Sequence, residues 1–199
     1  MAISTQQPDE HKLDGDFPSL KDHLLVAMPG LSDPFFKETV TYIIQHDEEG
    51  AMGVMINQTM PVSQFELLEQ LGFEPPERLK DEVVLSGGPV QMQRGFVLHR
   101  GHGRWDSTMA INDDVALTSS MDILEAISRN EGPRDYQLLL GYAGWDAGQL
   151  DQEMLENSWL TVPGNESLLF NTPISDRWQQ ASLTIGIDIN QLTLLAGHS

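Results

Sequence analysis

The chain of 199 residues contains no cysteine. Disulfide bonds, thiolate metal sites, iron–sulfur clusters and cysteine nucleophiles are therefore all excluded. Basic residues are also scarce, since 11 Lys and Arg stand against 30 Asp and Glu, and the formal net charge is −19. Because nucleic-acid affinity comes largely from cationic contacts with phosphates, this charge disfavours direct binding of DNA or RNA. We interpret the acidity as a source of solubility.

Long apolar runs are missing as well. No uninterrupted stretch approaches the ~20 residues that a membrane-spanning helix needs, so we expect no membrane insertion. Residues 1–19 are polar and acidic, with neither the basic start nor the apolar stretch of a secretory signal. We therefore predict a flexible tail over residues 1–19 and a single domain over residues 20–199 in a cytoplasmic protein.

Short apolar and β-branched segments separated by turn residues predict a sheet. The segments 38–46 and 51–57 flank a polar loop that ends in Gly50, a pattern typical of a β-hairpin. The segment 136–143 contains three consecutive leucines, which predicts a strand covered on both faces. Further strands are expected at residues 23–28, 83–85, 95–99, 107–111 and 192–195.

Helix-start signals predict four helices, over residues 63–71, from about 120 to 131, over 146–156 and over 176–185. Each start has a side chain that can accept a hydrogen bond from the first free backbone amides. The predicted caps are Ser63 paired with Glu66, Ser119 paired with Asp122, Asp146 paired with Gln149, and Ser175 alone. Together with the strands, these helices indicate an α+β protein.

Four sequence blocks stand in an order that resembles one protein family. They are the segment 24–29 with Asp33 and Phe36; His46 with the segment 53–57; the segment 87–90 with 96–99; and the segment 141–145 with Gln149, Leu150, Glu153, Trp159 and Phe170. From about residue 20 to residue 195 the chain resembles the AlgH/YqgE family. The resemblance implies a mixed, mostly antiparallel sheet curled toward a barrel with flanking helices, in a bacterial cytoplasmic protein. Members are often labelled transcriptional regulators, yet this sequence carries no DNA-binding motif.

Two glycine-containing segments could bind an anion. In the segment 141–150 the free amides of a helix start could do so, but Asp146 would occupy that position as the cap, so packing explains the segment better. The segment Gly87-Gly88-Pro89 lacks the spacing of a dinucleotide fold or a P-loop, and a tight turn is the simpler interpretation. A small pocket beside this loop stays open as an alternative.

The only basic cluster of the sequence runs from Arg94 to Arg104 and includes His99 and Arg100. Adjacent arginines oppose a metal cation, so we expect contact with an anion or an acidic partner there. The alternative is a hairpin loop whose arginines pair with surrounding carboxylates. His46 and Asn57 could face each other across the predicted hairpin, where a buried histidine hydrogen-bonded to an amide is the ordinary outcome.

The leading hypothesis is a non-enzymatic regulatory or protein-interaction domain that affects transcription, if at all, through an unidentified protein partner. The alternative is a small-molecule sensor or an uncharacterised enzyme with a pocket near the Gly87–Pro89 loop. No catalytic residue, metal site or cofactor is predicted, because no Gly-x-Ser-x-Gly elbow or nucleotide motif occurs. The candidate ligand or partner site comprises Pro29, Asp33, His46, Asn57, Gly87, Gly88, Pro89, His99, Arg100 and Arg104.

Overall fold

The computed structural model describes residues 18–31, 33–189 and 191–192. Within them lie ten strands: β1 (His23–Ala27), β2 (Val40–Asp47), β3 (Gly50–Met55), β4 (Thr59–Ser63), β5 (Val83–Ser86), β6 (Val90–Arg100), β7 (Thr108–Ala110), β8 (Val115–Thr118), β9 (Tyr136–Asp146) and β10 (Trp159–Pro163). The helices are α1 (Gln64–Gln70), α2 (Met121–Ser128), α3 (Gln149–Leu155) and α4 (Arg177–Leu183), with short helical turns η1 (Glu77–Lys80), η2 (Ser167–Asn171) and η3 (Ile174–Asp176). None of the helices in the described ranges is long and apolar enough to cross a membrane.

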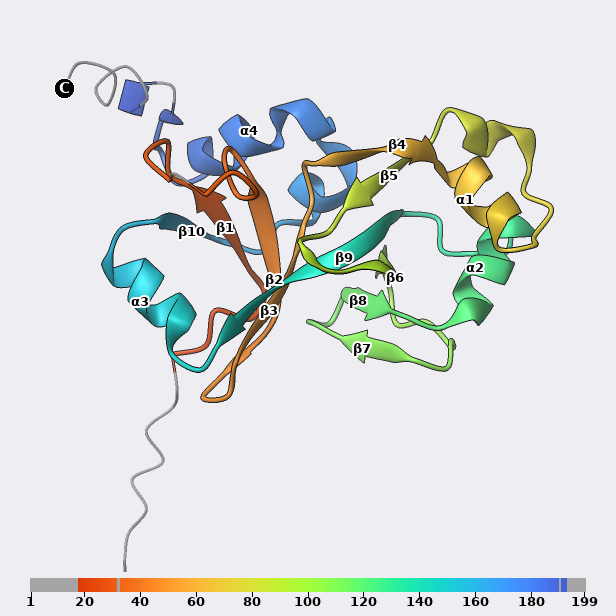
Figure 1. The fold of residues 1–199 in the computed structure, drawn as a ribbon, viewed down its shortest axis with the longest axis horizontal. Coiled ribbons are helices and arrows are strands. Elements are labelled where there is room, and N and C mark those ends of the chain that lie inside the picture. Colours follow the sequence, from red (N-terminus) through yellow and green to blue (C-terminus); the bar gives the residue numbers. More distant parts are fainter. Residues whose placement is uncertain (1–17, 32, 190, 193–199) are drawn as a thin grey trace, which may run out of the picture.

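The strands form one curled sheet in the order β10-β1-β2-β3-β9-β6-β8-β7, with β4 paired to β5 and β5 paired to β9 (Figure 1). The β5–β9 pair is parallel, and the other pairs between described strands are antiparallel. Helices flank the sheet at both ends of the molecule (Figure 1). The predicted α+β fold, a mixed and mostly antiparallel sheet curled toward a barrel, is therefore confirmed.

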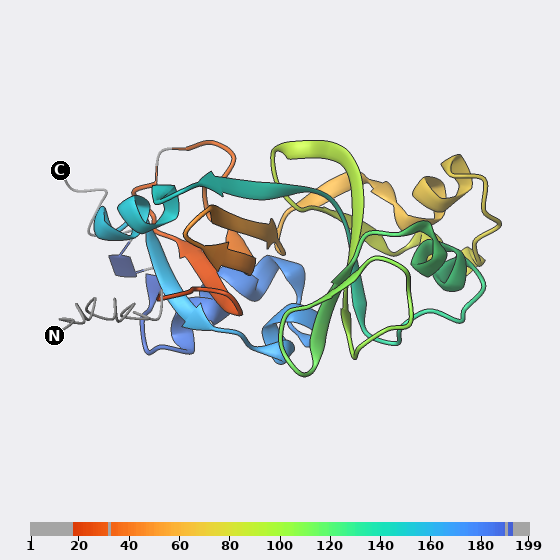
Figure 2. The same cartoon turned by 90° about the horizontal axis from the view of Figure 1, so that it is seen from below.

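The long strand β9 joins the two ends of the molecule. Along its first half it lies between β5 and β6, because Leu139 pairs with both Leu85 and Phe96. Along its second half it pairs with β3, where Ala143 is in register with Gly53. Figure 2 shows β9 running from the middle of the molecule toward the end that carries α3. One strand thus fixes the position of both halves of the sheet.

The Gly87-Gly88-Pro89 loop packs directly on β9 at Gly141. A Cβ atom at Gly141 would meet the carbonyl oxygen of Gly88, and a Cβ atom at Gly87 would meet the carbonyl oxygen of Gly141. The Gly87 amide also donates to the Leu140 carbonyl oxygen at 2.8 Å. Gly141 itself has φ +75°, which only glycine adopts readily. The backbones of the loop and of β9 are therefore in direct contact, and we call this contact at Gly141 the junction.

Three hydrophobic clusters stabilise the sheet, and helices cover each of them. The central cluster includes Tyr42 and Leu139 and is packed by α4 through Ala181. A second cluster lies under α3 and contains Trp145, Leu150 and Trp159 among others. A third joins α1 and α2 to the sheet through residues that include Leu68, Ile123 and Ile127. Each helix therefore buries one apolar face, as its sequence pattern requires.

Elements specified by local contacts form as predicted. The hairpin forms as β2 and β3, but its turn has two residues instead of the predicted four, because Asp47 pairs with Gly50. The capping box of α1 is complete, since the Ser63 amide donates to the Glu66 carboxylate at 2.8 Å and the Glu66 amide donates to Ser63 Oγ at 3.2 Å. The sequence does not predict strands β4, β8 and β10, each of which has only four or five residues.

Two predicted helix starts are wrong because the sheet extends further than expected. The N-cap residue of α2 is Ser120 instead of Ser119, since the Ser119 amide donates to the Ser107 carbonyl oxygen at 3.0 Å. The N-cap residue of α3 is Gly148 instead of Asp146, because Asp146 still belongs to β9 and pairs with Gly50 of β3. Pairing within the sheet outweighs the local capping preference at both positions.

The predictions for the chain ends have mixed outcomes. The N-cap residue of α4 is Asp176 instead of Ser175, because the turn η3 precedes the helix. The strand predicted at residues 192–195 is wrong at Leu192, which is helical, and residues 193–195 lie outside the described part of the chain. Most of the predicted tail, residues 1–17, also lies outside it. Ser19 Oγ donates to the His46 carbonyl oxygen at 2.7 Å.

Replacing Gly141 by alanine should destabilise the fold far more than replacing Gly148. Both glycines have positive φ, +75° and +71°, so alanine costs roughly 1–2 kcal/mol at either position. An added Cβ has open space at Gly148 but meets the Gly88 carbonyl oxygen at Gly141. We expect urea unfolding to show a loss of about 3 kcal/mol or more for Gly141→Ala. Equal losses in the two variants would contradict the close backbone approach.

Candidate functional site

A cleft of about 560 Å³ opens beside α3, where β9 ends and β10 begins. Aromatic rings form its walls: Phe36 from the loop after β1, Trp145 from β9 and Trp159 from β10. The remaining lining consists of Met28, Gly30, Leu31, Asp33, Gly144, Gln149, Glu153, Glu156, Asn157 and Ser158. We call this site the aromatic cleft. Its size and its mixture of rings with a few polar groups are typical of ligand sites.

The three rings of the aromatic cleft pack against one another. The ring centroids of Phe36 and Trp159 lie 5.5 Å apart at 80°, and those of Trp145 and Trp159 lie 6.2 Å apart at 77°. Phe36 stacks on Trp145 at 6.1 Å and 29°. Edge-to-face and offset arrangements of this kind are favoured by the ring quadrupoles. Because Trp145 and Trp159 are only 6% and 3% exposed, the walls belong to the core and are preformed.

The carboxylate of Glu153 holds both tryptophans. Its Oε2 accepts hydrogen bonds from Trp145 Nε1 at 3.0 Å and from Trp159 Nε1 at 2.8 Å. Its Oε1 accepts from Gln149 Nε2 at 3.0 Å, and Gln149 Oε1 accepts from the Asp146 amide at 3.0 Å. Hydrogen bonds to an ionised acceptor are the strong ones in proteins. Glu153 therefore ties the ends of β9 and β10 to α3.

The rim of the aromatic cleft is acidic. Asp33 and Glu156 are exposed, and with Glu153 they give three acids, while no Lys, Arg or His occurs among the described lining residues. Asp33 Oδ1 accepts from the Phe35 amide and Glu156 Oε1 from Gln152 Nε2, each at 2.8 Å. The second oxygen of each rim carboxylate has no hydrogen bond within the described residues. The arrangement suits a cationic group placed against aromatic walls.

The predicted site residues from the N-terminal half of the chain lie at separate places in the fold. Asp33 lines the aromatic cleft, and Pro29 lies in the same loop between the lining residues Met28 and Gly30. Asn57 holds the start of β2, since its Oδ1 accepts from the Val40 amide at 2.7 Å. Its amide group also donates to a backbone carbonyl oxygen at 2.8 Å. Asn57 therefore has a structural role at the end of the hairpin that is distant from its turn.

The expectation that His46 and Asn57 face each other is wrong. His46 lies beside the hairpin turn and pairs with Ala51, whereas Asn57 follows the far end of β3. His46 is buried, its Nδ1 accepts from the Leu20 amide at 3.0 Å, and its Nε2 lies 3.7 Å from the Asp151 carboxylate of α3. The antiparallel register therefore places the two side chains at opposite ends of the hairpin.

Within the basic cluster, His99 is fully buried. Its Nε2 lies 2.8 Å from Thr118 Oγ1, and its ring meets Trp105 edge to face with centroids 5.0 Å apart. Burial lowers the pKa of His99, so the ring is neutral at pH 7. His99 is therefore part of the packing between β6 and β8.

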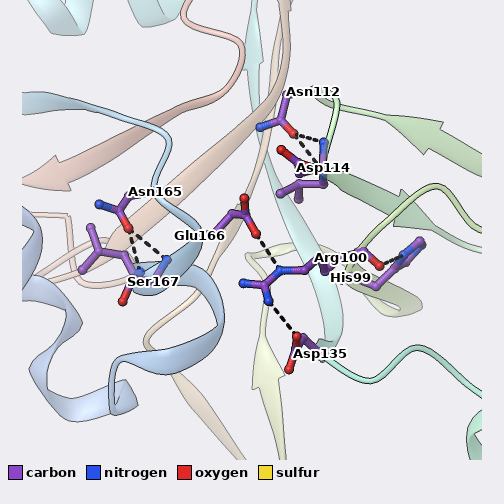
Figure 3. Close-up of polar contacts among 10 residues, drawn as sticks. His99, Arg100, Asn112, Asp114, Asp135, Asn165, Glu166 and Ser167 are labelled. Atoms are coloured by element: carbon purple, nitrogen blue, oxygen red, sulfur yellow. Dashed lines mark hydrogen bonds and ion pairs between the residues drawn. The ribbon is translucent and has the colours of Figure 1, made fainter.

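Arg100 lies in an ion-pair network that Figure 3 shows in close-up. Its Nη1 donates to Asp135 at 2.8 Å and its Nε to Glu166 at 2.6 Å, while the guanidinium lies 5.5 Å from the centre of the Phe170 ring. The carboxylates of Asp135, just before β9, and of Glu166, after β10, thus both pair with Arg100 of β6. Of the alternatives for the basic cluster, internal pairing describes Arg100. Arg104, in contrast, is exposed.

The structure does not bring the ten predicted residues into one site. Gly87, Gly88 and Pro89 line no part of the aromatic cleft, and His99 and Arg100 belong to other contacts. Sequence reasoning missed the residues that build the cleft, namely Phe36, Trp145, Glu153 and Trp159. All four occur in the sequence blocks that carry the family resemblance, and this resemblance is the signal that could have identified them. Among the described residues, no group of three His, Asp or Glu could hold a metal ion.

Comparison with known proteins gives one consistent result. A family model described as AlgH-like matches residues 24–190. A UPF0301 protein of Saccharophagus degradans is 48% identical over 198 residues, which covers 98% of each chain. The solution structure of the AlgH protein from Pseudomonas aeruginosa has a TM-score of 0.77 and 40% identity, covering 98% of this chain and 100% of that one. A crystal structure of a Corynebacterium diphtheriae protein shares the fold, with a TM-score of 0.68 at 20% identity over 86% of this chain and 90% of that one.

The substitution His99→Gln should flatten the pH dependence of stability in mild acid. Burial lowers the pKa of His99 below its ordinary value of 6.5. As the pH falls below 6.5, the unfolded chain therefore binds a proton that the folded protein does not, and stability is lost down to the lowered pKa. The slope approaches about 1.4 kcal/mol per pH unit for one such group.

Urea unfolding of both proteins from about pH 8 to about pH 5 measures this effect. The difference in stability between wild type and His99→Gln should be constant above pH 6.5, the ordinary value for histidine, and should change below it. Other acid-titrating groups contribute equally to both proteins and cancel in the difference. Parallel profiles over the whole range would show that the folded protein binds this proton as readily as the unfolded chain.

Proposed function

The chain belongs to the AlgH-like family, and from this premise we propose that it is a non-enzymatic cytoplasmic regulatory domain that acts through a protein partner. We assign partner binding to the aromatic cleft, and we take a Lys or Arg side chain of the partner as its occupant. One observation carries the proposal: three aromatic walls, three acids and no basic side chain among the described residues of the lining. Residues 20–199 would form this domain.

A basic side chain satisfies both features of the aromatic cleft at once. Its charge is attracted to the rim acids Asp33 and Glu156, and it can pack against the exposed part of the Phe36 ring. Its aliphatic stem can lie along the apolar lining residues Met28 and Leu31. The net charge of −19 adds attraction for a basic segment at longer range. The cleft and the net charge of the whole chain thus both favour a positively charged partner.

The hydrogen bonding of Glu153 supports binding in preference to catalysis. A general acid or base needs a carboxyl oxygen within reach of the proton that it transfers. Both oxygens of Glu153 already accept hydrogen bonds, three in total, from Trp145, Trp159 and Gln149. The carboxylate of Glu153 therefore has a positioning role. What it positions are the two ring walls that a ligand would contact.

An effect on transcription would pass through the protein partner. The 30 acids against 11 Lys and Arg repel a phosphate backbone, so direct contact with DNA is not part of the proposal. The partner segment is instead expected to be basic, and its binding to weaken with salt as the charges are screened.

The double variant Asp33→Asn, Glu156→Gln should weaken the binding of basic peptides. It removes two rim charges while Glu153 continues to hold the tryptophans. The probe is a library of lysine- and arginine-containing decapeptides, and tryptophan fluorescence reports binding. We expect the best binders to lose up to about tenfold in affinity, which corresponds to two partly exposed ion pairs.

The double variant Asp113→Asn, Glu131→Gln is the matched control, because both acids are exposed and lie outside the cleft. Its affinity should stay within about twofold of wild type, since distant charges are screened. Equal weakening in both double variants would argue against the cleft as the binding site. Turnover of a substrate that is abolished by a substitution in the cleft would argue against a non-enzymatic domain.

A further inference from the structure

A second cleft, of about 470 Å³, lies where β3, β6, β7, β8 and β9 come together. Its lining consists of Met52, Arg94, Phe96, Asp106, Ser107, Thr108, Met109, Leu117, Ser119 and Tyr142. We call it the Arg94 cleft. It shares no lining residue with the aromatic cleft, so the two are separate sites.

Arg94 is the one cation among the described lining residues, and it is not used in an ion pair. It ends an irregular stretch of β6, where Val90 pairs with Tyr142 and the next paired residue is Gly95. Its guanidinium lies 5.1 Å from the centre of the Phe96 ring, and its Nη1 donates to a glutamine oxygen at 3.4 Å. No carboxylate in the described residues pairs with it. Most of its donors are therefore available to a ligand.

Three hydroxyl groups accompany Arg94 in the lining. Those of Ser107, Ser119 and Tyr142 make no hydrogen bond within the described part of the chain. The Ser119 amide donates to the Ser107 carbonyl oxygen at 3.0 Å, which fixes both backbones while their hydroxyls stay unused. Thr108 differs, because its hydroxyl lies 2.8 Å from Thr118 Oγ1. The lining of the cleft thus contains four polar side chains with donors that a ligand can use.

The rest of the wall is apolar and partly aromatic. Phe96 and Tyr142 meet edge to face, with ring centroids 6.1 Å apart. Met52, Met109 and Leu117 complete this part of the lining. Thioether side chains adapt their shape and make favourable contacts with aromatic rings. An apolar body about the size of one ring therefore suits this wall.

We propose that the Arg94 cleft binds a small organic anion, a carboxylate or a phosphate monoester carried on an apolar body. The guanidinium of Arg94 pairs with two oxygens of the anion, because its forked donors match that geometry. The hydroxyls of Ser107, Ser119 and Tyr142 donate to these same oxygens and, in a phosphate monoester, also to the third one, and the apolar wall packs against the body. Asp106 is exposed in the same lining and opposes the anion. The site goes beyond partner binding and would give the protein a small-molecule ligand.

Phenyl phosphate and benzoate are the anionic probes, and benzyl alcohol is the neutral one. Nitrogen–proton chemical shifts of the full chain report both the affinity and the location. We expect at least one anion to shift the signals of Arg94, Ser107 and Ser119 at millimolar concentration. Arg94→Gln should weaken its binding by about tenfold or more, because a charge-assisted contact is lost. Asp106→Asn should tighten it by about threefold, because a repelling charge is removed.

The matched control is Arg104→Gln, which removes the same charge from an exposed position outside the lining. Its affinity should stay within about twofold of wild type. Three results would overturn the proposal: no binding of either anion at millimolar concentration, benzyl alcohol binding as tightly as the anions, or equal weakening by Arg94→Gln and Arg104→Gln. Peptide binding at the aromatic cleft does not involve Arg94, so this proposal and the proposed function can fail independently.

Discussion

Strand β9 has to hydrogen-bond with β3, β5 and β6 within eleven residues, although a strand has only two edges. The chain meets this constraint by changing partners along one edge, from β5 to β3, and the change occurs around Gly141. There φ is +75°, and the Gly87-Gly88 backbone approaches so closely that no Cβ atom fits. The relative position of the two halves of the sheet, and of the helices that cover them, depends on this junction.

The same strand places both candidate sites. Tyr142 follows the junction directly and lines the Arg94 cleft, while Trp145 lies three residues further along and forms a wall of the aromatic cleft. The two sites have opposite electrostatic character. In the aromatic cleft, both oxygens of Glu153 accept hydrogen bonds and the rim acids are exposed, whereas Arg94 in the second cleft has no carboxylate partner among the described residues. A chain of net charge −19 can therefore present one site to a basic partner and one to an anion.

Sequence patterns correctly predict the elements whose structure depends on contacts between residues close together in the chain. The hairpin and the Ser63 capping box depend on neighbours within a few residues, and both form as expected. Asp146 fails as a cap because it pairs with Gly50 within the sheet, and Ser119 fails because its amide donates to the Ser107 carbonyl oxygen; no local pattern reveals either contact. Contacts between distant parts of the chain also decide the sites, and the sequence does not reveal them. Arg100 pairs with Asp135 and Glu166, and Glu153 joins tryptophans from two different strands. Family resemblance marks Trp145, Glu153 and Trp159, but only the fold shows that they meet.

Hydrogen exchange of the indole N–H groups in the wild-type protein tests whether Glu153 holds the walls of a preformed aromatic cleft. The chain has four tryptophans. Trp145 and Trp159 donate to Glu153, Trp178 donates to a backbone carbonyl oxygen at 2.9 Å, and Trp105 Nε1 has no hydrogen bond within the described residues. If Glu153 accepts from both rings, we expect slow exchange for Trp145 and Trp159, comparable with Trp178, and faster exchange for Trp105. Exchange at Trp145 and Trp159 as fast as at Trp105 would contradict it.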